Sequence, residues 1–366
     1  MSTEESIASL QQTFVDSLRD SVQDPTILHA FQMVPRDPFV GDFFTFNKET
    51  GQWERVPKDN PGWLKEVYTN RQLVTGINQY GNPHVSSSMP SIMARMIQSL
   101  KLQSGQRVLE IGTGTGYNAA LLACIVGASN VVTIDINETL LGAARKRIEQ
   151  TVGAGVTVLC ADGRNIPEIL GTFDAIILSA SSQYIDPSWI AALNQRGRLI
   201  VNWNTSFCKV FFELEKQNQG LIGTIAEFCG DFMELHDGNG IAPRAIGWSK
   251  HAPFLEQMDF RRELVTNFDF GFFLQVHLPS LSYQSFTGKQ SGRHLYTVMD
   301  SCERAVYFST EKVRGEASLW GEIKELHEKF NALGQPRRKA FSLQVDKRGS
   351  ITFFYQGHTI AAVNSH

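Results

Sequence analysis

The chain has little net charge and no stretch that could cross a membrane. Its 366 residues carry 34 basic and 37 acidic side chains, which leaves a formal charge of -3. A protein without a strong positive field does not gather nucleic acid or anionic lipid by charge alone. The longest uncharged apolar run, 119–126, is much shorter than the roughly 20 residues that a transmembrane helix needs. We therefore expect no nucleic-acid partner and no membrane partner.

We also expect no secretory leader, and the sequence has no closely paired cysteines. Glu4 and Glu5 stand where a leader needs positive charge followed by an apolar stretch. The five cysteines are odd in number and widely spaced, without the close pairs that hold zinc. We expect them to be small buried side chains in a reducing compartment. The sequence thus predicts a cytoplasmic protein without a metal site.

The middle of the chain alternates short apolar runs with helical patterns, which is typical of a parallel sheet covered by helices. Asn218-Gln219-Gly220 joins two further strand-like runs and predicts an antiparallel hairpin. The predicted strands are 108–111, 131–135, 156–160, 175–179 and 199–203, the helices are 117–126, 138–150 and 187–193, and the hairpin pairs 207–215 with 221–228. The predicted fold class is α/β, a Rossmann-like sheet that is mostly parallel and ends in an antiparallel hairpin.

The flanking segments are less regular. Residues 6–18 and 27–33 predict short helices, whereas 45–70 shows no period and predicts an irregular excursion. The turn cluster 236–240, His-Asp-Gly-Asn-Gly, indicates a domain boundary. After it come a helical pattern over 318–333 and a hairpin that pairs 341–345 with 351–355. We therefore predict two domains, residues 1–235 and a smaller α+β domain of residues 236–366.

A glycine-rich loop, Gly112-Thr113-Gly114-Thr115-Gly116, follows the first predicted strand. Glycine permits positive φ and lets a ligand approach the main chain closely. Asp135 ends the next strand, where an acid accepts the hydroxyls of a ribose, and Asp162 follows the third strand, where it can reach an adenine amine. A bare strand-to-helix turn would explain the glycines alone. The three features together predict a nucleoside-binding edge.

Two classes of nucleoside cofactor fit such an edge. A dinucleotide fingerprint needs Gly or Ala where Tyr117 stands, and the Glu110 carboxylate before the glycines would repel a pyrophosphate. The same carboxylate suits the ammonium and sulfonium groups of S-adenosylmethionine. The sequence therefore favours S-adenosylmethionine over NAD.

Several motifs together resemble those of the protein L-isoaspartate O-methyltransferases, over roughly residues 30–235. They are Val34-Pro35-Arg36 with Phe39-Val40, Ser88 to Ala94, Glu110 to Tyr117, Asp162-Gly163-Arg164, Phe173 to Ile177 with Ser179-Ala180-Ser181, and Gly197-Arg198-Leu199-Ile200. The resemblance implies a class I methyltransferase fold, with Ser88 as the catalytic residue beside the methyl group and the substrate carboxylate. It also implies cofactor contacts from Ser86, Ser87, Glu110, Gly112, Thr113, Gly114, Tyr117, Asp135, Ile136, Asp162 and Gly163.

The chain departs from this family on the substrate side. Ser91 and Met93 stand where the family has histidines, and Glu234 stands where it has a proline. The region after Leu235 is similar to relatives that methylate one aspartate of a ribosomally made peptide precursor. The first interpretation is therefore precursor modification, from methyl ester through succinimide to isoaspartate, with the C-terminal domain gripping the precursor.

The implied reaction is methylation of an aspartyl or isoaspartyl carboxylate in a peptide or protein. A carboxylate with a pKa near 4 is ionised at pH 7, so its attack on a sulfonium methyl needs no general base. We expect positioning, including orientation by Ser88, to supply most of the catalysis. Two alternatives are general isoaspartyl repair and a catalytically inactive cofactor-binding scaffold. The peptide substrate and the oligomeric state stay open.

Overall fold

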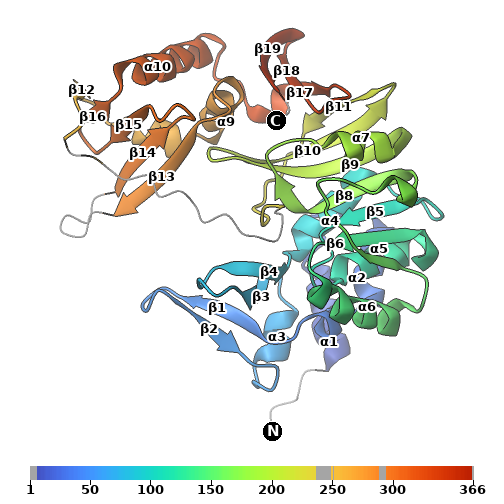
Figure 1. Ribbon diagram of the computed structural model, residues 1–366. Helices are drawn as coiled ribbons and strands as arrows, with labels where there is room; N and C mark the ends of the chain where they lie inside the picture. The colour runs from blue at the N-terminus through green and yellow to red at the C-terminus, as the bar shows by residue number, and fades with distance from the viewer. Residues whose placement is uncertain (1–5, 236–248, 250, 288–293, 365–366) are drawn as a thin grey trace.

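The structure is a computed structural model that describes residues 6–235, 249, 251–287 and 294–364. The strands form three sheets: one of ten strands in the centre, one of four near the N-terminus and one of five in the C-terminal region (Figure 1). The turn cluster 236–240, which we predicted as a domain boundary, lies outside the described residues.

Half of the central sheet is parallel. Its strands are β5 (Val108–Ile111), β6 (Val131–Asp135), β7 (Thr157–Cys160), β8 (Phe173–Ser182) and β9 (Leu193–Asn204). Their order in the sheet is β9-β8-β5-β6-β7, so the chain runs outward from β5 and then returns to its other side. Ligands bind such sheets at the carboxyl ends of the strands beside this reversal. The predicted parallel core is confirmed, and its reversal lies beside the glycine-rich loop.

The other half is antiparallel. The predicted hairpin forms as β10 (Lys209–Gln217) and β11 (Gly220–Ile225) next to β9. The C-terminal hairpin also forms, as β17 (Phe341–Val345) and β18 (Ile351–Tyr355), and β19 (His358–Val363) follows it. However, β17 pairs with β11, so these last strands continue the central sheet. The antiparallel part is thus longer than the single hairpin that we predicted.

Helices cover one face of the parallel strands. They are α1 (Ile7–Asp16), α2 (Pro25–Met33), α4 (Pro90–Leu100), α5 (Tyr117–Val126) and α6 (Glu138–Val152). Successive residues of a strand point to opposite faces. Val108 accordingly packs with these helices, whereas Leu109 packs into the core on the second face with α7 (Pro187–Ala192). Short 3₁₀ turns lie at Asp37–Phe39, Ala128–Asn130, Glu168–Leu170 and Arg338–Ala340.

The predicted irregular excursion at 45–70 is wrong. It contributes to a four-stranded antiparallel sheet of β1 (Phe43–Asn47), β2 (Gln52–Val56), β3 (Leu73–Ile77) and β4 (Pro83–Ser87), with the short helix α3 (Trp63–Val67). The β1–β2 hairpin is mostly exposed, so it lacks the apolar alternation that marks a strand in sequence. The sheet matters to the site because β4 leads directly into Ser88.

The C-terminal region shares the core of the second face. It contains α8 (Arg261–Val265), α9 (Phe268–His277), α10 (Ala317–Ala332) and the sheet of β12 (Phe254–Glu256), β13 (Ser282–Thr287), β14 (His294–Met299), β15 (Ala305–Phe308) and β16 (Val313–Gly315). Phe272 of α9 is fully buried, and its ring lies 6.4 Å from that of Trp203 in β9 and 5.6 Å from that of Phe353 in β18. One hydrophobic cluster therefore joins the central sheet to this region.

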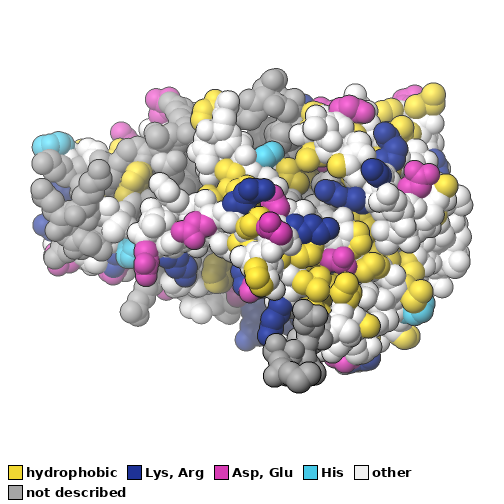
Figure 2. Space-filling view, turned by 90° about the horizontal axis from the view of Figure 1, so that it is seen from below, with side chains coloured by type: hydrophobic (Ala, Val, Ile, Leu, Met, Phe, Trp, Pro, Cys, Tyr) yellow, Lys and Arg dark blue, Asp and Glu magenta, His cyan; other side chains and the backbone are white. Residues whose placement is uncertain are grey.

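The surface agrees with the balanced composition. In Figure 2, basic and acidic side chains are interspersed on the face shown. The expectation of buried cysteines is wrong for four of the five, because Cys124, Cys160, Cys229 and Cys302 are exposed and only Cys208 is buried. Across the described ranges, no helix combines the length and apolarity that a membrane span requires.

Candidate active site

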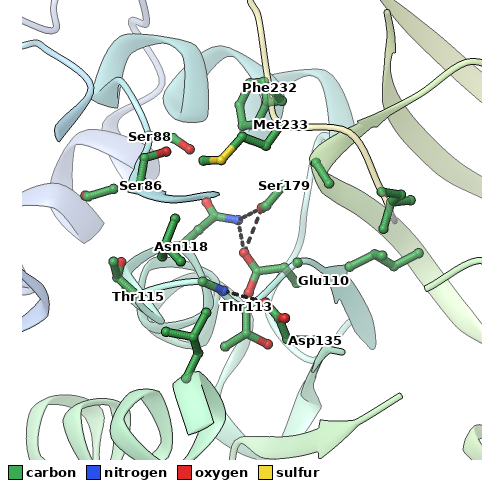
Figure 3. A pocket seen from close by; sticks show the side chains of 18 of the residues that line it. Ser86, Ser88, Glu110, Thr113, Thr115, Asn118, Asp135, Ser179, Phe232 and Met233 are labelled. Atoms are coloured by element: carbon green, nitrogen blue, oxygen red, sulfur yellow. Dashed lines mark hydrogen bonds between the residues drawn. The ribbon is translucent and has the colours of Figure 1, made fainter. Parts of the chain in front are cut away.

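A pocket of about 290 Å³ lies at the carboxyl end of β5. The glycine-rich loop and Asp135 form one side of it, and the residues 84–89 with the segment 231–235 form the other. Figure 3 shows Ser88, Phe232 and Met233 together on the side opposite Thr113 and Asp135. We call these the loop side and the acceptor side of the pocket.

The glycine-rich loop has a backbone conformation that leaves space for a ligand. Gly112 and Gly114 have φ values of +98° and +49°, which side chains other than glycine rarely adopt. The Gly114 N–H donates to Asp135 Oδ2 at 3.0 Å. A Cβ on Gly114 would meet only the Ser86 carbonyl oxygen, at 3.7 Å, so a side chain there would extend into the pocket. The glycine keeps this space free for a ligand.

Glu110 is a fully buried carboxylate at the base of the pocket. The Asn118 amide and the Ser179 hydroxyl each donate to Oε1 at 2.8 Å, and the Thr133 hydroxyl donates to Oε2 at 2.7 Å. Burial outweighs these hydrogen bonds and raises the pKa of Glu110 to about 7. Because its oxygens are covered, Glu110 acts on a ligand through its charge and through the groups it orients.

Asn118 is a site residue that our sequence analysis missed. Its Nδ2 donates to Glu110, which turns Oδ1 towards the pocket (Figure 3). That oxygen is buried and has no hydrogen-bond partner in the described part of the chain. A buried acceptor without a partner is costly, so it indicates a missing donor. The signal in the sequence was a polar residue in the otherwise apolar α5.

Asp135 and Ile136, which the sequence predicts to contact the cofactor, both line the pocket. Asp135 accepts one backbone N–H on each oxygen, from Gly114 at 3.0 Å and from Asn137 at 3.1 Å. These bonds fix the carboxylate, and each oxygen keeps a lone pair for a further donor. The geometry therefore suits two adjacent hydroxyl groups.

Asp162 and Gly163 have different positions relative to the pocket. Gly163 lines the pocket, and a Cβ there would lie 2.3 Å from Ile111 Cγ2, so close packing requires the glycine. Asp162 does not line the pocket, and its carboxylate forms an ion pair with Arg164 at 2.8 Å. Its predicted contact with a cofactor therefore stays a prediction.

Tyr117 begins α5 at the end of the loop, and its ring packs into the core. The ring is 2% exposed and lies 5.4 Å from the ring of Phe39. The hydroxyl donates to the Val34 carbonyl oxygen at 3.5 Å. The side chain thus supports the pocket wall, and the predicted contact of Tyr117 with the cofactor stays a prediction.

Arg36 supports the acceptor side from within the protein core. It is fully buried, and its guanidinium donates to backbone carbonyls of two separate segments, 67–71 and 87–88, and to the Ser87 hydroxyl. Burial without a carboxylate partner lowers the pKa of Arg36 to about 10. All three serines line the pocket; the Ser87 hydroxyl also accepts from Arg36, whereas Ser86 and Ser88 are half-buried.

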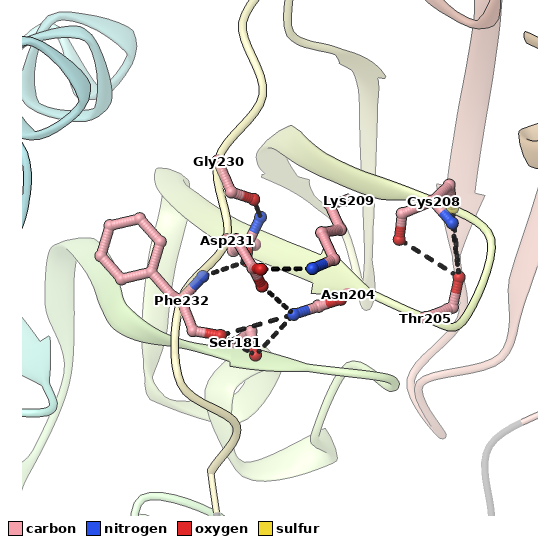
Figure 4. Close-up of polar contacts among 9 residues, drawn as sticks. Ser181, Asn204, Thr205, Cys208, Lys209, Gly230, Asp231 and Phe232 are labelled. Carbon is pink, nitrogen blue, oxygen red and sulfur yellow. Dashed lines mark hydrogen bonds and ion pairs between the residues drawn. The ribbon is translucent and has the colours of Figure 1, made fainter. Parts of the chain in front are cut away.

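The segment 231–235 closes the acceptor side. The Ser181 hydroxyl donates to the Phe232 carbonyl oxygen at 2.9 Å, and the Ser181 N–H donates to that of Met233 at 2.8 Å. Asp231 accepts from Asn204 at 3.0 Å and pairs with Lys209 (Figure 4). Glu234, in the place of the family's proline, accepts from Gln183 at 3.0 Å. The ends of three strands thus fix this segment.

The charges around the pocket have one sign. Among the described residues that line it, four are carboxylates and none is a lysine or an arginine. The four are Glu110, Asp135, Asp231 and Glu234. A pyrophosphate would be repelled here, whereas a ligand with cationic groups would be attracted.

The comparisons with known proteins agree with this site. The family model for protein-L-isoaspartate(D-aspartate) O-methyltransferase matches residues 9–239. A protein-L-isoaspartate O-methyltransferase of Bradyrhizobium sp. (strain BTAi1) is 33% identical over 182 residues, 50% of this chain and 72% of the relative. Protein-L-isoaspartate O-methyltransferase 1 of Nitrosospira multiformis is 36% identical over 181 residues, 49% of this chain and 73% of the relative.

Solved structures show the same fold. A protein-L-isoaspartate O-methyltransferase structure covers 97% of this chain and 100% of its own, with a TM-score of 0.57 and 22% identity. A Plasmodium falciparum structure assigned to the same activity, in complex with S-adenosyl-L-homocysteine, covers 62% of this chain and 98% of its own, with a TM-score of 0.50 and 19% identity. The first likeness extends over the C-terminal region as well.

Proposed function

Because the chain belongs to the protein-L-isoaspartate(D-aspartate) O-methyltransferase family, we propose that its pocket transfers a methyl group from S-adenosylmethionine to the isoaspartyl carboxylate of a peptide or protein. The enzyme is a methyltransferase, and its cofactor is S-adenosylmethionine, which supplies an activated methyl group on a sulfonium.

One observation carries the choice of ligand: the pocket has four carboxylates and, among the described lining residues, no lysine or arginine. S-adenosylmethionine has an ammonium, a sulfonium and one carboxylate, and no phosphate. The carboxylates of the pocket attract these two cationic groups. Glu110, whose pKa is about 7, is the buried member of this set at the base of the pocket.

The residues of the loop side fit the cofactor. Asp135 would hold the ribose hydroxyls, because each of its oxygens has a free lone pair beside the glycine-rich loop. The unpartnered Oδ1 of Asn118 would accept from the ammonium. Gly114 would let the cofactor lie against the main chain, since nothing but the Ser86 carbonyl stands within 4 Å of a Cβ there.

The acceptor side would orient the carboxylate. Its attack needs no general base at pH 7, so the protein has to hold it in line with the methyl group. The Ser88 hydroxyl can donate to the carboxylate without protonating it, and Arg36 holds the Ser88 backbone at 3.1 Å. Phe232 and Met233, on the same side of the pocket as Ser88, would exclude water.

Transfer of labelled methyl groups tests this function. The enzyme would be incubated with labelled S-adenosylmethionine and two peptides that differ only in carrying isoaspartate or aspartate at one position. We expect label in the isoaspartyl peptide that is lost as methanol in mild base, as a methyl ester requires. Binding of S-adenosylhomocysteine without transfer to either peptide would instead support the inactive scaffold.

Modification of an aspartate in a ribosomally made precursor is the second candidate. The observation that favours it is a second cavity beside the acceptor side, one wall of which belongs to the C-terminal region. Such a wall could grip a dedicated substrate. A constrained macrocyclic peptide with a normal aspartate, added to the same assay, separates the candidates: precursor modification requires that it is methylated faster than the linear isoaspartyl peptide.

A further inference from the structure

The second cavity, of about 310 Å³, lies where the central sheet meets the C-terminal region. The connection before β10, from Ser206 to Lys209, forms one wall, and the segment 229–231 forms another. Phe268 at the start of α9, Tyr283 of β13 and Arg338 complete it. Its volume is close to that of the methyl-transfer pocket, and it is large enough for a side chain.

Three aromatic rings line the cavity, those of Phe207, Phe268 and Tyr283. The rings of Phe207 and Tyr283 lie 5.0 Å apart, and Phe268 is 64% exposed. Its exposed ring is covered on one side by the Arg338 guanidinium, 6.0 Å from the ring centre. Together with Phe207 and Tyr283, this ring forms a contiguous apolar lining that another apolar group can cover.

The charged groups of this cavity are already paired. Lys209 pairs with Asp231, and Arg338 lies 3.5 Å from Asp269. A phosphate or a carboxylate would therefore have to break an existing pair before it could bind. An apolar or aromatic group has no such cost, so the lining favours it.

Asp231 connects this cavity to the methyl-transfer pocket, because it lines both. Asn204 and Lys209 hold its carboxylate (Figure 4). Asn202 donates to the preceding Gly230 carbonyl oxygen at 3.1 Å. The partition between the two cavities is therefore narrow and fixed. An extended peptide advances about 3.3 Å per residue, so a residue close in sequence to the methylated one can cross it.

We propose that the second cavity binds an apolar or aromatic side chain of the substrate, a few residues away from the isoaspartyl residue. This subsite rests on the function proposed above and adds a sequence preference to it. The C-terminal region supplies Phe268, Tyr283 and Arg338, so it takes part in substrate selection without touching the cofactor.

A walking-phenylalanine series tests the subsite. Isoaspartyl peptides of glycine and serine would carry one Phe at each position from four residues before to four residues after the isoaspartate. We expect one register to raise kcat/KM roughly tenfold over the peptide without Phe. Two variants should reduce this gain in kcat/KM to less than about twofold. Phe268→Ala removes one wall of the cavity, and Ser206→Trp fills the cavity from an exposed position. Both variants should methylate the plain peptide as the wild type does.

Phe254→Ala is the matched control. Phe254 is another exposed Phe of the C-terminal region, 53% exposed, with the Arg314 guanidinium 6.0 Å from its ring, and it does not line the cavity. It should keep the full gain. The subsite is refuted if no register matters, if the gain persists in both cavity variants, or if Phe254→Ala loses it equally. Failure to methylate any isoaspartyl peptide would instead refute the proposed function.

Discussion

The loop side and the acceptor side of the pocket are built in different ways. The loop side comes from consecutive strands, and its hydrogen bonds join neighbours in the parallel sheet, such as Glu110 with Thr133. The acceptor side is assembled from segments that are far apart in sequence, 84–89 and 231–235, with Arg36 behind the first. Cofactor binding therefore depends on local geometry, whereas substrate placement depends on tertiary contacts.

The largest effect on this comparison is expected from Arg36→Met. It leaves buried carbonyls of 67–71 and 87–88 without their donor and should lower the free energy of unfolding by about 3–5 kcal/mol. Urea unfolding of the variant and of Arg36→Lys, which keeps the charge but fewer donors, measures this. If Arg36→Met lowers the free energy of unfolding by less than about 1 kcal/mol, the acceptor side does not depend on the hydrogen bonds of Arg36.

Glu110, on the loop side, makes the stability of the cofactor-free protein depend on pH. Its pKa is about 7 in the folded protein against 4.5 for an ordinary glutamate, so the folded state binds the proton more tightly. The stability contributed by the protonated form is full below pH 4.5 and is lost as the pH rises through 7. Relative to Glu110→Gln, the cofactor-free wild type should lose roughly 3 kcal/mol between these limits. Parallel stability curves for the two proteins would contradict the shifted pKa.

Gly114→Val tests the loop side alone. The valine would be strained at a φ of +49° and would fill the space between the loop and Ser86, so we expect S-adenosylhomocysteine affinity to fall by more than about 100-fold. Calorimetric titration measures this. Gly105→Val, at a φ of +84° in open space outside the pocket, carries the strain without the obstruction and should bind normally. Normal binding by Gly114→Val would remove the loop from the site.

Ser88→Ala is expected to have the smallest effect, and it separates substrate placement from cofactor binding. The cofactor should bind as before, because Ser88 lies on the acceptor side, while kcat should fall by roughly tenfold through lost orientation. Single-turnover methylation with saturating cofactor measures the step. An unchanged kcat would leave Ser88 as a structural residue of the segment before α4.

The same contrast explains what could be predicted from sequence. The glycine-rich loop, Asp135 and the parallel strands were predictable because each is encoded by adjacent residues with a fixed spacing. Asn118 was missed because its role arises from the orientation that Glu110 imposes, which no local pattern records. Asp162 follows the right strand, yet it pairs with the neighbouring Arg164.

Tertiary pairing decided the remaining differences. The exposed β1–β2 hairpin has no apolar alternation, so its strands could not be recognised. The C-terminal hairpin was predicted correctly as a local unit, but its partner β11 lies more than a hundred residues earlier. A truncation at the predicted boundary would therefore also uncover β11, which makes point variants such as Phe268→Ala the cleaner test of recognition.

A crystal structure of the enzyme with S-adenosylhomocysteine and an isoaspartyl peptide would show whether cofactor and substrate occupy the two sides of the pocket. We predict the ribose hydroxyls on Asp135, the ammonium within hydrogen-bonding distance of Asn118 Oδ1, and the isoaspartyl carboxylate beside Ser88, facing the sulfur. An adenosine bound away from Asp135, or a carboxylate bound away from Ser88 and the segment 231–235, would contradict the division of the pocket into a loop side and an acceptor side.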